Sequence, residues 1–326
     1  MRHGMGVLSV LRRASGWTVA LLAMAFAADA LGQSGLRLSH DDLQRRANGV
    51  LALMSFSIVP DITTSSLSLG SGGAGVEGSS DFFMTQLGGG DTISDSVPIY
   101  LEGVLAYSRY DPTFIATQGA ERRSIPTKWN SLSATGGIGW DFKLTDELKL
   151  RPIFNFALGN VTSDLRGASW YIGRKTGRDV DFLDRGSLNA YGLGGSVMLD
   201  WEHYRPGYEV DVELRYSDIR LQSFDSSAAV KGRATARSAN LWARYRAPTG
   251  ITLLQRPLRY VLELTHSEFL GDQRGALGFD RLTSLGAGLE LDSSAYNVIV
   301  TRTRLVGRYV FGTNVSGFSV GLAVSF

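Results

Sequence analysis

The residues of this sequence that could carry catalysis or bind a metal ion are few and far apart. The chain has no cysteine, and beyond its first 30 residues the histidines are His40, His203 and His266, without the spacing of zinc ligands. His266 directly precedes Ser267, but neighbours on a strand point to opposite faces and cannot form a nucleophile and base pair directly. The sequence therefore predicts no enzyme and no metal site.

A glycine-rich stretch and the overall charge give equally little support for a nucleotide cofactor or a nucleic acid. Residues 70–75, GSGGAG, match the G-x-G-x-x-G pattern, but VEGSSD follows them instead of a helix. This stretch is typical of a flexible external loop. The formal net charge of +2 is too small for binding that depends on neutralising phosphates. We expect no cofactor and no nucleic-acid partner.

Charged residues alternate with apolar residues along several segments. In YEVDVELRYSD, residues 208–218, tyrosine, valine and leucine occupy one face, and charged residues the other. Charges of both signs on the inner face of a barrel predict a network of ion pairs between strands, with or without a water-filled passage. The predicted network comprises Glu209, Asp211, Glu213, Arg215, Arg244, Arg259, Glu263, Arg302, Arg304 and Arg308, and the same face holds Glu102, Asp141, Lys143, Lys149, Arg151, Asp200, Arg246 and Glu290.

Period-two segments long enough to cross a membrane as strands recur along the chain. The clearest are residues 98–108, 133–144, 148–158, 187–201, 207–218, 236–246, 258–267, 282–292, 297–311 and 314–326, and weaker ones are 62–69 and 81–87. Aromatic residues near the ends of several apolar faces fit girdles at the membrane interfaces: Tyr107, Trp140, Trp201, Tyr208, Tyr216 and Tyr245. We predict an all-β fold, an antiparallel transmembrane barrel of about 12 strands.

The lengths of the connections favour a meandering barrel over a sandwich. Short connections at 145–147, 203–206 and 293–296 alternate with long polar ones at 109–132, 159–186 and 219–235. Short periplasmic turns and long external loops give this alternation, whereas Greek-key crossovers would scatter the lengths. Two exceptions are the long connection 247–257 and the very short link at 312–313.

The N-terminus has the three parts of a secretory signal peptide. Arginines at positions 2, 12 and 13 precede an apolar run, WTVALLAMAFAA, and Ala28-Asp29-Ala30 suits a signal peptidase. We predict a signal peptide over 1–30, export from the cytoplasm and a location in the outer membrane of a Gram-negative envelope.

The next segment, 31–60, is expected to lie in the lumen or across its periplasmic mouth. Its apolar residues Leu43, Ala47, Val50, Leu51 and Met54 recur at helical spacing, although residues 51–58 are also compatible with a strand. The barrel itself is assigned to 61–326.

The last eight residues, SVGLAVSF, resemble the C-terminal β-signal of outer-membrane proteins. Gly321, Val324 and the final Phe326 occupy the positions that carry this signal. The resemblance implies that the barrel-assembly machinery and periplasmic chaperones are partners, together with outer-membrane lipid.

The mature chain as a whole is similar to the translocator domain of autotransporters, and most to solitary barrels without a passenger. The likeness rests on 36–69, on QLGGGDTISD at 86–95 leading into PIYLEGVLAYSRYDP, and on the strand number. Only some 30 residues separate the signal from the barrel, too few for a passenger domain. The resemblance implies a structural or transport role without catalysis. The alternatives are a small porin or uptake channel, suggested by the charged lumen, and a lipid hydrolase using His266.

Overall fold

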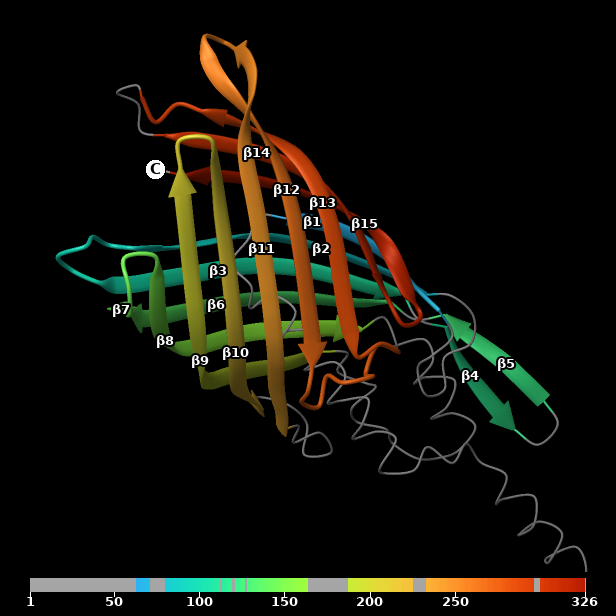
Figure 1. Cartoon of the computed structure of the whole chain (residues 1–326). Helices are drawn as coiled ribbons and strands as arrows, with labels where there is room; N and C mark the ends of the chain where they lie inside the picture. Colours follow the sequence, from blue (N-terminus) through green and yellow to red (C-terminus); the bar gives the residue numbers. More distant parts are fainter. Residues whose placement is uncertain are drawn as a thin grey trace, which may run out of the picture. The chain divides into compact units, whose positions relative to one another are not determined.

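The computed structural model describes residues 63–70, 80–111, 113–118, 121–126, 128–163, 187–224, 233–295 and 300–325 (Figure 1). The predicted signal peptide 1–30, the predicted lumen segment 31–60 and Phe326 lie outside the described residues. The predictions for these three parts therefore remain predictions.

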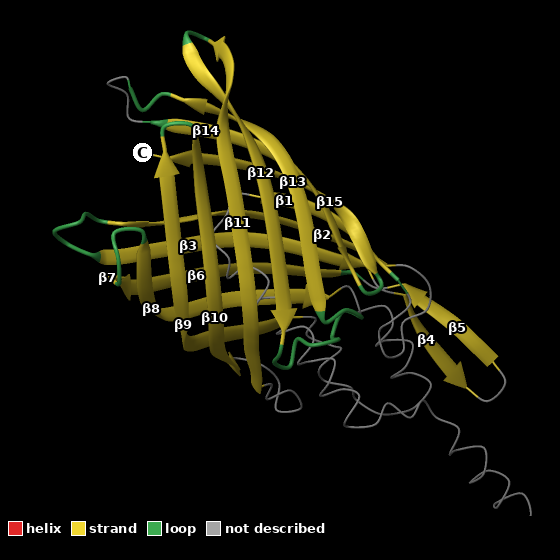
Figure 2. Cartoon of the chain, viewed as in Figure 1, coloured by secondary structure: helices red, strands yellow, loops and turns green. Residues whose placement is uncertain are grey.

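The described chain consists of strands joined by turns and loops (Figure 2). The main sheet contains β1 (Thr63–Leu69), β2 (Ser80–Thr92), β3 (Ile99–Asp111), β6 (Trp129–Trp140), β7 (Phe142–Lys143), β8 (Leu148–Ser163), β9 (Ser187–Arg205), β10 (Tyr208–Phe224), β11 (Arg233–Leu253), β12 (Arg256–Phe269), β13 (Arg281–Asp292), β14 (Arg302–Gly312) and β15 (Val315–Ser325). A separate two-stranded sheet contains β4 (Thr113–Gln118) and β5 (Glu121–Pro126). Within these residues, no helix has the length and apolar character needed to cross a membrane.

The main sheet closes on itself. Each long strand pairs antiparallel with its neighbours in the chain order, β6 pairs with β8, and β15 pairs with β1 in register from Thr63↔Gly321 to Leu69↔Val315. The 13-stranded sheet is thus a ring of twelve long strands plus the short β7, which continues β6 alongside β8. The predicted antiparallel barrel of about 12 strands is confirmed, and each predicted segment corresponds to one long strand.

Two connections differ from the sequence prediction. The long connection predicted at 247–257 is part of β11 and β12, which meet in a two-residue turn at Leu254 and Gln255 with φ of 53° and 60°. A register shift between Pro248 and Thr252 interrupts the period-two pattern there and conceals the strand in the sequence. The predicted loop 109–132 contains the β4 and β5 hairpin.

The barrel has two distinct ends, which we name by their connections. The short-turn end carries the turns at 144–147, 206–207 and 254–255, and the loop end carries the connection 270–280. The link between β14 and β15, also at the loop end, is the expected short turn, with Asn314 at φ 60°. The short turn predicted at 293–296 belongs to a longer connection, because β13 ends at Asp292 and β14 begins at Arg302.

The outer surface of the barrel is apolar. On β15, Phe318, Val320, Leu322 and Val324 are 37–70% exposed, whereas Ser319 is buried. Exposed large apolar side chains also lie on the outward face of other strands: Phe154, Phe156 and Leu158 on β8, Leu214 and Tyr216 on β10, Tyr260, Leu262 and Leu264 on β12, and Leu285 and Leu289 on β13. Such an outward band, repeated around a closed ring, gives the exterior the character of a lipid-facing surface.

The closure between β15 and β1 depends on the absence of a side chain at Gly317. A Cβ atom there would collide with the carbonyl oxygen of Ser66 and lie 2.8 Å from the Cα of Leu67. We expect Gly317→Ala to destabilise the barrel by about 1–3 kcal/mol, the usual cost of overpacking, and to lower the temperature at which the folded form disappears on unheated gels. Gly307→Ala on β14 is the matched control, because a Cβ there meets nothing within 4 Å. Equal melting of the two variants would contradict this assignment.

Candidate functional site in the barrel lumen

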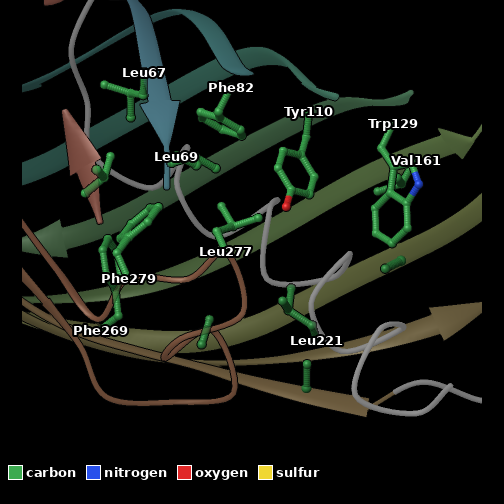
Figure 3. Close-up of a cluster of buried hydrophobic side chains, with 14 of the residues drawn as sticks. Leu67, Leu69, Phe82, Tyr110, Trp129, Val161, Leu221, Phe269, Leu277 and Phe279 are labelled. Carbon is green, nitrogen blue, oxygen red and sulfur yellow. The ribbon is translucent and has the colours of Figure 1, made fainter. Parts of the chain in front are cut away.

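The inward-facing residues form two layers with opposite chemistry. The charged layer lies toward the short-turn end and contains Glu102, Asp141, Arg151, Asp200, Glu209, Asp211, Arg215, Arg244, Arg246, Arg259, Glu263, Glu290, Arg302, Arg304 and Arg308. The apolar layer lies toward the loop end and contains Leu67, Leu69, Phe82, Tyr110, Trp129, Val161, Leu188, Ala190, Ile219, Leu221, Ala234, Ala236, Phe269, Leu277, Phe279, Val310 and Val315 (Figure 3).

Strand geometry explains how one strand contributes to both layers. Successive side chains point to opposite faces, so every second residue of β10 faces inward. Asp211 and Arg215 lie inward in the first half of this strand, and Ile219 and Leu221 lie inward in its second half. The change from charged to apolar therefore occurs along the strand, at the same face, between Arg215 and Ile219.

Glu290 is at the centre of the charged layer. It is 0% exposed, and its carboxylate lies 3.2 Å from Arg304 Nη1 and 3.4 Å from Arg246 Nη1. Arg259 Nη1 is 3.8 Å away. A buried carboxylate is stabilised only when cations and donors replace water around it, and here three guanidinium groups from three strands do so.

Glu209 and Asp211 on β10 also form ion pairs with this group of arginines. Arg246 Nη2 lies 2.9 Å from both carboxylates, and Arg244 Nη2 lies 2.7 Å from Asp211. Glu209 also accepts hydrogen bonds from Arg259 at 2.8 Å and from Arg302 at 2.9 Å. The acids and bases thus form one continuous network over β10 to β14.

Several of these ion pairs join strands that are not neighbours in the sheet. Arg215 on β10 donates from both terminal nitrogens to Glu102 on β3, at 2.7 and 2.8 Å, although three strands separate them around the ring. Arg308 on β14 donates to Glu263 on β12 at 2.8 Å, and Arg302 on β14 reaches Glu209 on β10. Arg215 and Arg302 therefore extend into the lumen past three strands of the wall, and Arg308 passes one strand, β13.

A second group of charges lies on β8, on β9 and at Asp141, between β6 and β7. Arg151 donates to Asp141 and to Asp200, the latter at 3.1 Å, and its guanidinium lies 4.0 Å from the centre of the Tyr100 ring. All three charged side chains are at most 7% exposed. This arrangement adds an aromatic face to the ion pairs.

The structure brings nine of the ten predicted network residues into ion pairs; Glu213 shares their face of β10 but has no hydrogen bond or ion pair with another described residue. Lys143 lies opposite Lys149 on the lumen face, as predicted, because the pairing with β8 continues without a shift from β6 into β7. It is 54% exposed at the short-turn end and pairs with Asp95 at 2.8 Å.

Sequence reasoning missed three sets of inward-facing residues. Asn155 and Ser196 bridge Glu102 and Arg215 by hydrogen bonds, but their lack of charge gave no signal beyond their inward position. Tyr204 donates to Asp211 at 2.6 Å from a position that was predicted to be a turn. The apolar layer was missed because most strands extend farther toward the loop end than the pattern showed.

His203 and His266, the two histidines within the described residues, lie on the outer side of the barrel and not in the lumen network. His203 Nδ1 is 2.8 Å from Glu147 in a short turn, and this hydrogen bond, with Arg205, holds the pKa of Glu147 below its usual range. His266 Nδ1 is 2.8 Å from Thr283 Oγ1, and its Nε2 is 3.4 Å from Glu268. Over the described ranges, no group of three or more His, Asp or Glu side chains could hold a metal ion.

A closed antiparallel ring with an apolar exterior and a polar interior layer defines a β-barrel of the outer-membrane type. The solved structures that this chain is similar to include translocator domains of autotransporters, the group that its sequence also resembles. The AIDA-I transport unit from Escherichia coli has a TM-score of 0.46 and 12% identity, covering 86% of this chain and 99% of that one. The NalP translocator domain from Neisseria meningitidis has a TM-score of 0.44 and 15% sequence identity, and the match covers 88% of this chain and 96% of that one. The β-domain of BrkA from Bordetella has a TM-score of 0.44 and 14% sequence identity, and the match covers 81% of this chain and 97% of that one.

No protein-family model and no curated protein matches this sequence. The similarity to the solved barrels concerns the arrangement of strands alone.

The position of Glu290 makes a direct test of the charged layer possible. Glu290→Ala leaves Arg246, Arg259 and Arg304 without their shared carboxylate, so we expect a loss of about 3–5 kcal/mol in the free energy of unfolding, as for other buried pairs broken on one side. Glu147→Ala is the control, because its pairs with His203 and Arg205 lie at a turn and are expected to contribute less than about 1 kcal/mol. Urea unfolding in lipid vesicles measures both, and similar losses would contradict the central role of Glu290.

Proposed function

We propose that this chain is an integral protein of the bacterial outer membrane, similar to an autotransporter translocator without a passenger, with a structural or transport role and no catalysis. The observation that supports the proposal is the difference in polarity between the outer and inner faces of one closed ring of strands. Apolar side chains face outward, and paired charges face inward. A water-soluble barrel of this length would bury its apolar face instead.

Aromatic side chains on the outer surface support the orientation of the barrel in a membrane. At the short-turn end, Tyr208, Tyr245 and Tyr260 form a row with ring centres 5.9–6.0 Å apart, and Tyr208 also contacts His203. Aromatic rings prefer the membrane interface, where one end is apolar and the other wet. We infer that this row marks the periplasmic interface, so that the loop end faces the outside.

The contents of the lumen favour a structural role over that of a small porin or uptake channel. An open passage requires a continuous path for water and ions, whereas Arg215 and Arg302 extend across the lumen to acids on distant strands. Removing Arg215 would leave the buried carboxylate of Glu102 without its ion pair, which is costly. The uptake-channel alternative therefore needs a rearrangement of this network.

The proposed partners are outer-membrane lipid, the barrel-assembly machinery and periplasmic chaperones. Of the predicted signal residues, Val324 is 37% exposed on the outer face of β15. Gly321 faces the lumen side, where a Cβ would collide with the guanidinium of Arg308. A side chain at this position would therefore displace the Arg308 guanidinium, which pairs with Glu263.

Lipid contact can be tested on β10. Leu214 is 51% exposed in the middle of the outer apolar face, so Leu214→Arg is expected to cost about 2–4 kcal/mol of folding free energy in lipid vesicles. Leu254→Arg is the control, because Leu254 is 78% exposed at a two-residue turn beyond the aromatic row and we expect little change there. If both arginines were tolerated equally, Leu214 would not face lipid.

The assembly signal can be tested by a pair of phenylalanine substitutions. We expect Phe326→Ala to reduce strongly the amount of folded barrel in the outer membrane of cells, while refolding of the purified chain into vesicles is unchanged. Phe318→Ala serves as the control: Phe318 is 70% exposed on the same strand but lies outside the last residues that carry the signal. Heat-dependent migration on gels separates folded from unfolded protein, and normal assembly of the Phe326 variant would count against the signal.

A further inference from the structure

The connection between β12 and β13 packs into the barrel at its loop end. We call residues 270–280, LGDQRGALGFD, the cap segment. Three of its side chains are almost fully buried: Gln273 at 3%, Phe279 at 3% and Leu277 at 5% exposed. A polar, glycine-rich connection normally lies on the surface, so this degree of burial calls for a structural reason.

The cap segment is attached to one strand, β11, at Thr235 and Arg237. The amides of Leu270 and Asp272 donate to the carbonyl oxygens of Arg237 and Thr235, at 2.9 and 2.8 Å. Side chains replace the backbone in the remaining bonds: Asp272 Oδ2 accepts from the Thr235 amide at 2.7 Å, and Gln273 accepts from the Arg237 amide at 3.2 Å. Gln273 also donates to the Arg237 carbonyl at 2.6 Å. The amide of Gln273 thus acts as a substitute for a peptide group.

Two features of the backbone allow this attachment. Gly271 lies against β11 so closely that a Cβ atom would collide with the carbonyl oxygen of Thr235 and approach the Arg237 amide nitrogen to 2.6 Å. Gly275 and Gly278 have φ of 69° and 88°, which side chains disfavour. They form a tight turn in which Gly275 and Phe279 share a hydrogen bond of 3.0 Å.

The far part of the cap segment fills the apolar layer. Leu277 and Phe279 belong to the same cluster as Leu67, Phe82 and Val310, and Figure 3 shows them among side chains that come from several strands of the ring. The rings of Phe269 and Phe279 meet edge to face with centres 5.8 Å apart. Apolar burial is the main contact of this part, with one long hydrogen bond of 3.5 Å from Asn314 Nδ2 to the Gly278 carbonyl oxygen.

We propose that the cap segment is a displaceable closure of the loop-end mouth of the barrel. Beyond Asp272 its attachment to β11 uses the Gln273 side chain and no ladder of backbone bonds. Loss of this anchor frees the segment to leave the mouth as a unit and exposes the apolar layer to the outside. The proposal relies on the proposed function for the direction in which the loop end faces, and it adds an element that covers the apolar layer at that end.

Displacement of the cap segment can be tested with a single introduced thiol, because the chain contains no cysteine. Ala236 lies in the apolar layer on β11 and is 3% exposed, so Ala236→Cys places a single thiol behind the cap segment. In intact cells this thiol is expected to react slowly with a membrane-impermeant maleimide. Adding Gly271→Ala is expected to make labelling about tenfold faster, the factor that corresponds to one lost net hydrogen bond in the closed state.

Controls separate the movement of the cap segment from general damage. Gly89→Ala in the same reporter chain should leave labelling slow, because a Cβ at Gly89 meets nothing within 4 Å. If Gly271→Ala does not fold, Gln273→Ala removes the side-chain anchor without a collision and provides the decisive comparison. Unchanged labelling in a folded variant, or fast labelling with the cap segment unaltered, would overturn the proposal. Absence of folded barrel from the membrane fraction in every variant would instead reject the proposed function.

Discussion

The structure depends on the pairing of its last strand with its first. Ser65 on β1 donates a hydrogen bond of 3.0 Å to Ser319 on β15, and the two residues are 254 positions apart in the chain. In hydrocarbon each unpaired backbone group costs several kcal/mol, so an open sheet cannot exist there. No partial set of strands satisfies this condition. The barrel therefore becomes stable in the membrane only when β15 has joined β1, and every other feature follows from that closure.

Closure creates an interior whose charges must be matched across it. Arg215 and Glu102 come from strands that share no backbone hydrogen bonds, yet they meet at 2.7 Å. A shift of one residue in the register of β10 would turn Arg215 toward lipid and leave Glu102 unpaired. Buried ion pairs add little net stability compared with apolar packing. Their effect here is on the register of the strands: any register other than the observed one would leave buried charges unpaired and would be less stable.

The sequence was sufficient to predict the strands, because the period-two pattern is local and each strand alternates independently of its partners. It also predicted which face carries charge, as at Glu209, Asp211 and Arg215. The partners of these residues could not be predicted, since the contact of Arg302 with Glu209 depends on the curvature of the whole ring. The pattern failed where it was interrupted, as between Pro248 and Thr252. The signal that Gln273 lies inside a barrel is absent from the sequence, because a glutamine in a glycine-rich stretch is typical of an exposed loop.

Contact with water has different consequences for the two layers of the lumen. This difference explains why apolar side chains of a connection are buried at the loop end. Charges near the short-turn end, such as Lys149 and Arg302 at 22% side-chain exposure, remain partly hydrated, whereas Glu290 deeper inside is fully buried. The side chains of the charged layer can therefore become increasingly exposed to water toward the short-turn end. The apolar layer cannot, because Phe82 or Val310 facing an aqueous mouth would lose the free energy of burial. A barrel with an apolar loop end therefore requires apolar cover there, and Leu277 and Phe279 contribute to it from a connection that would otherwise lie in solvent.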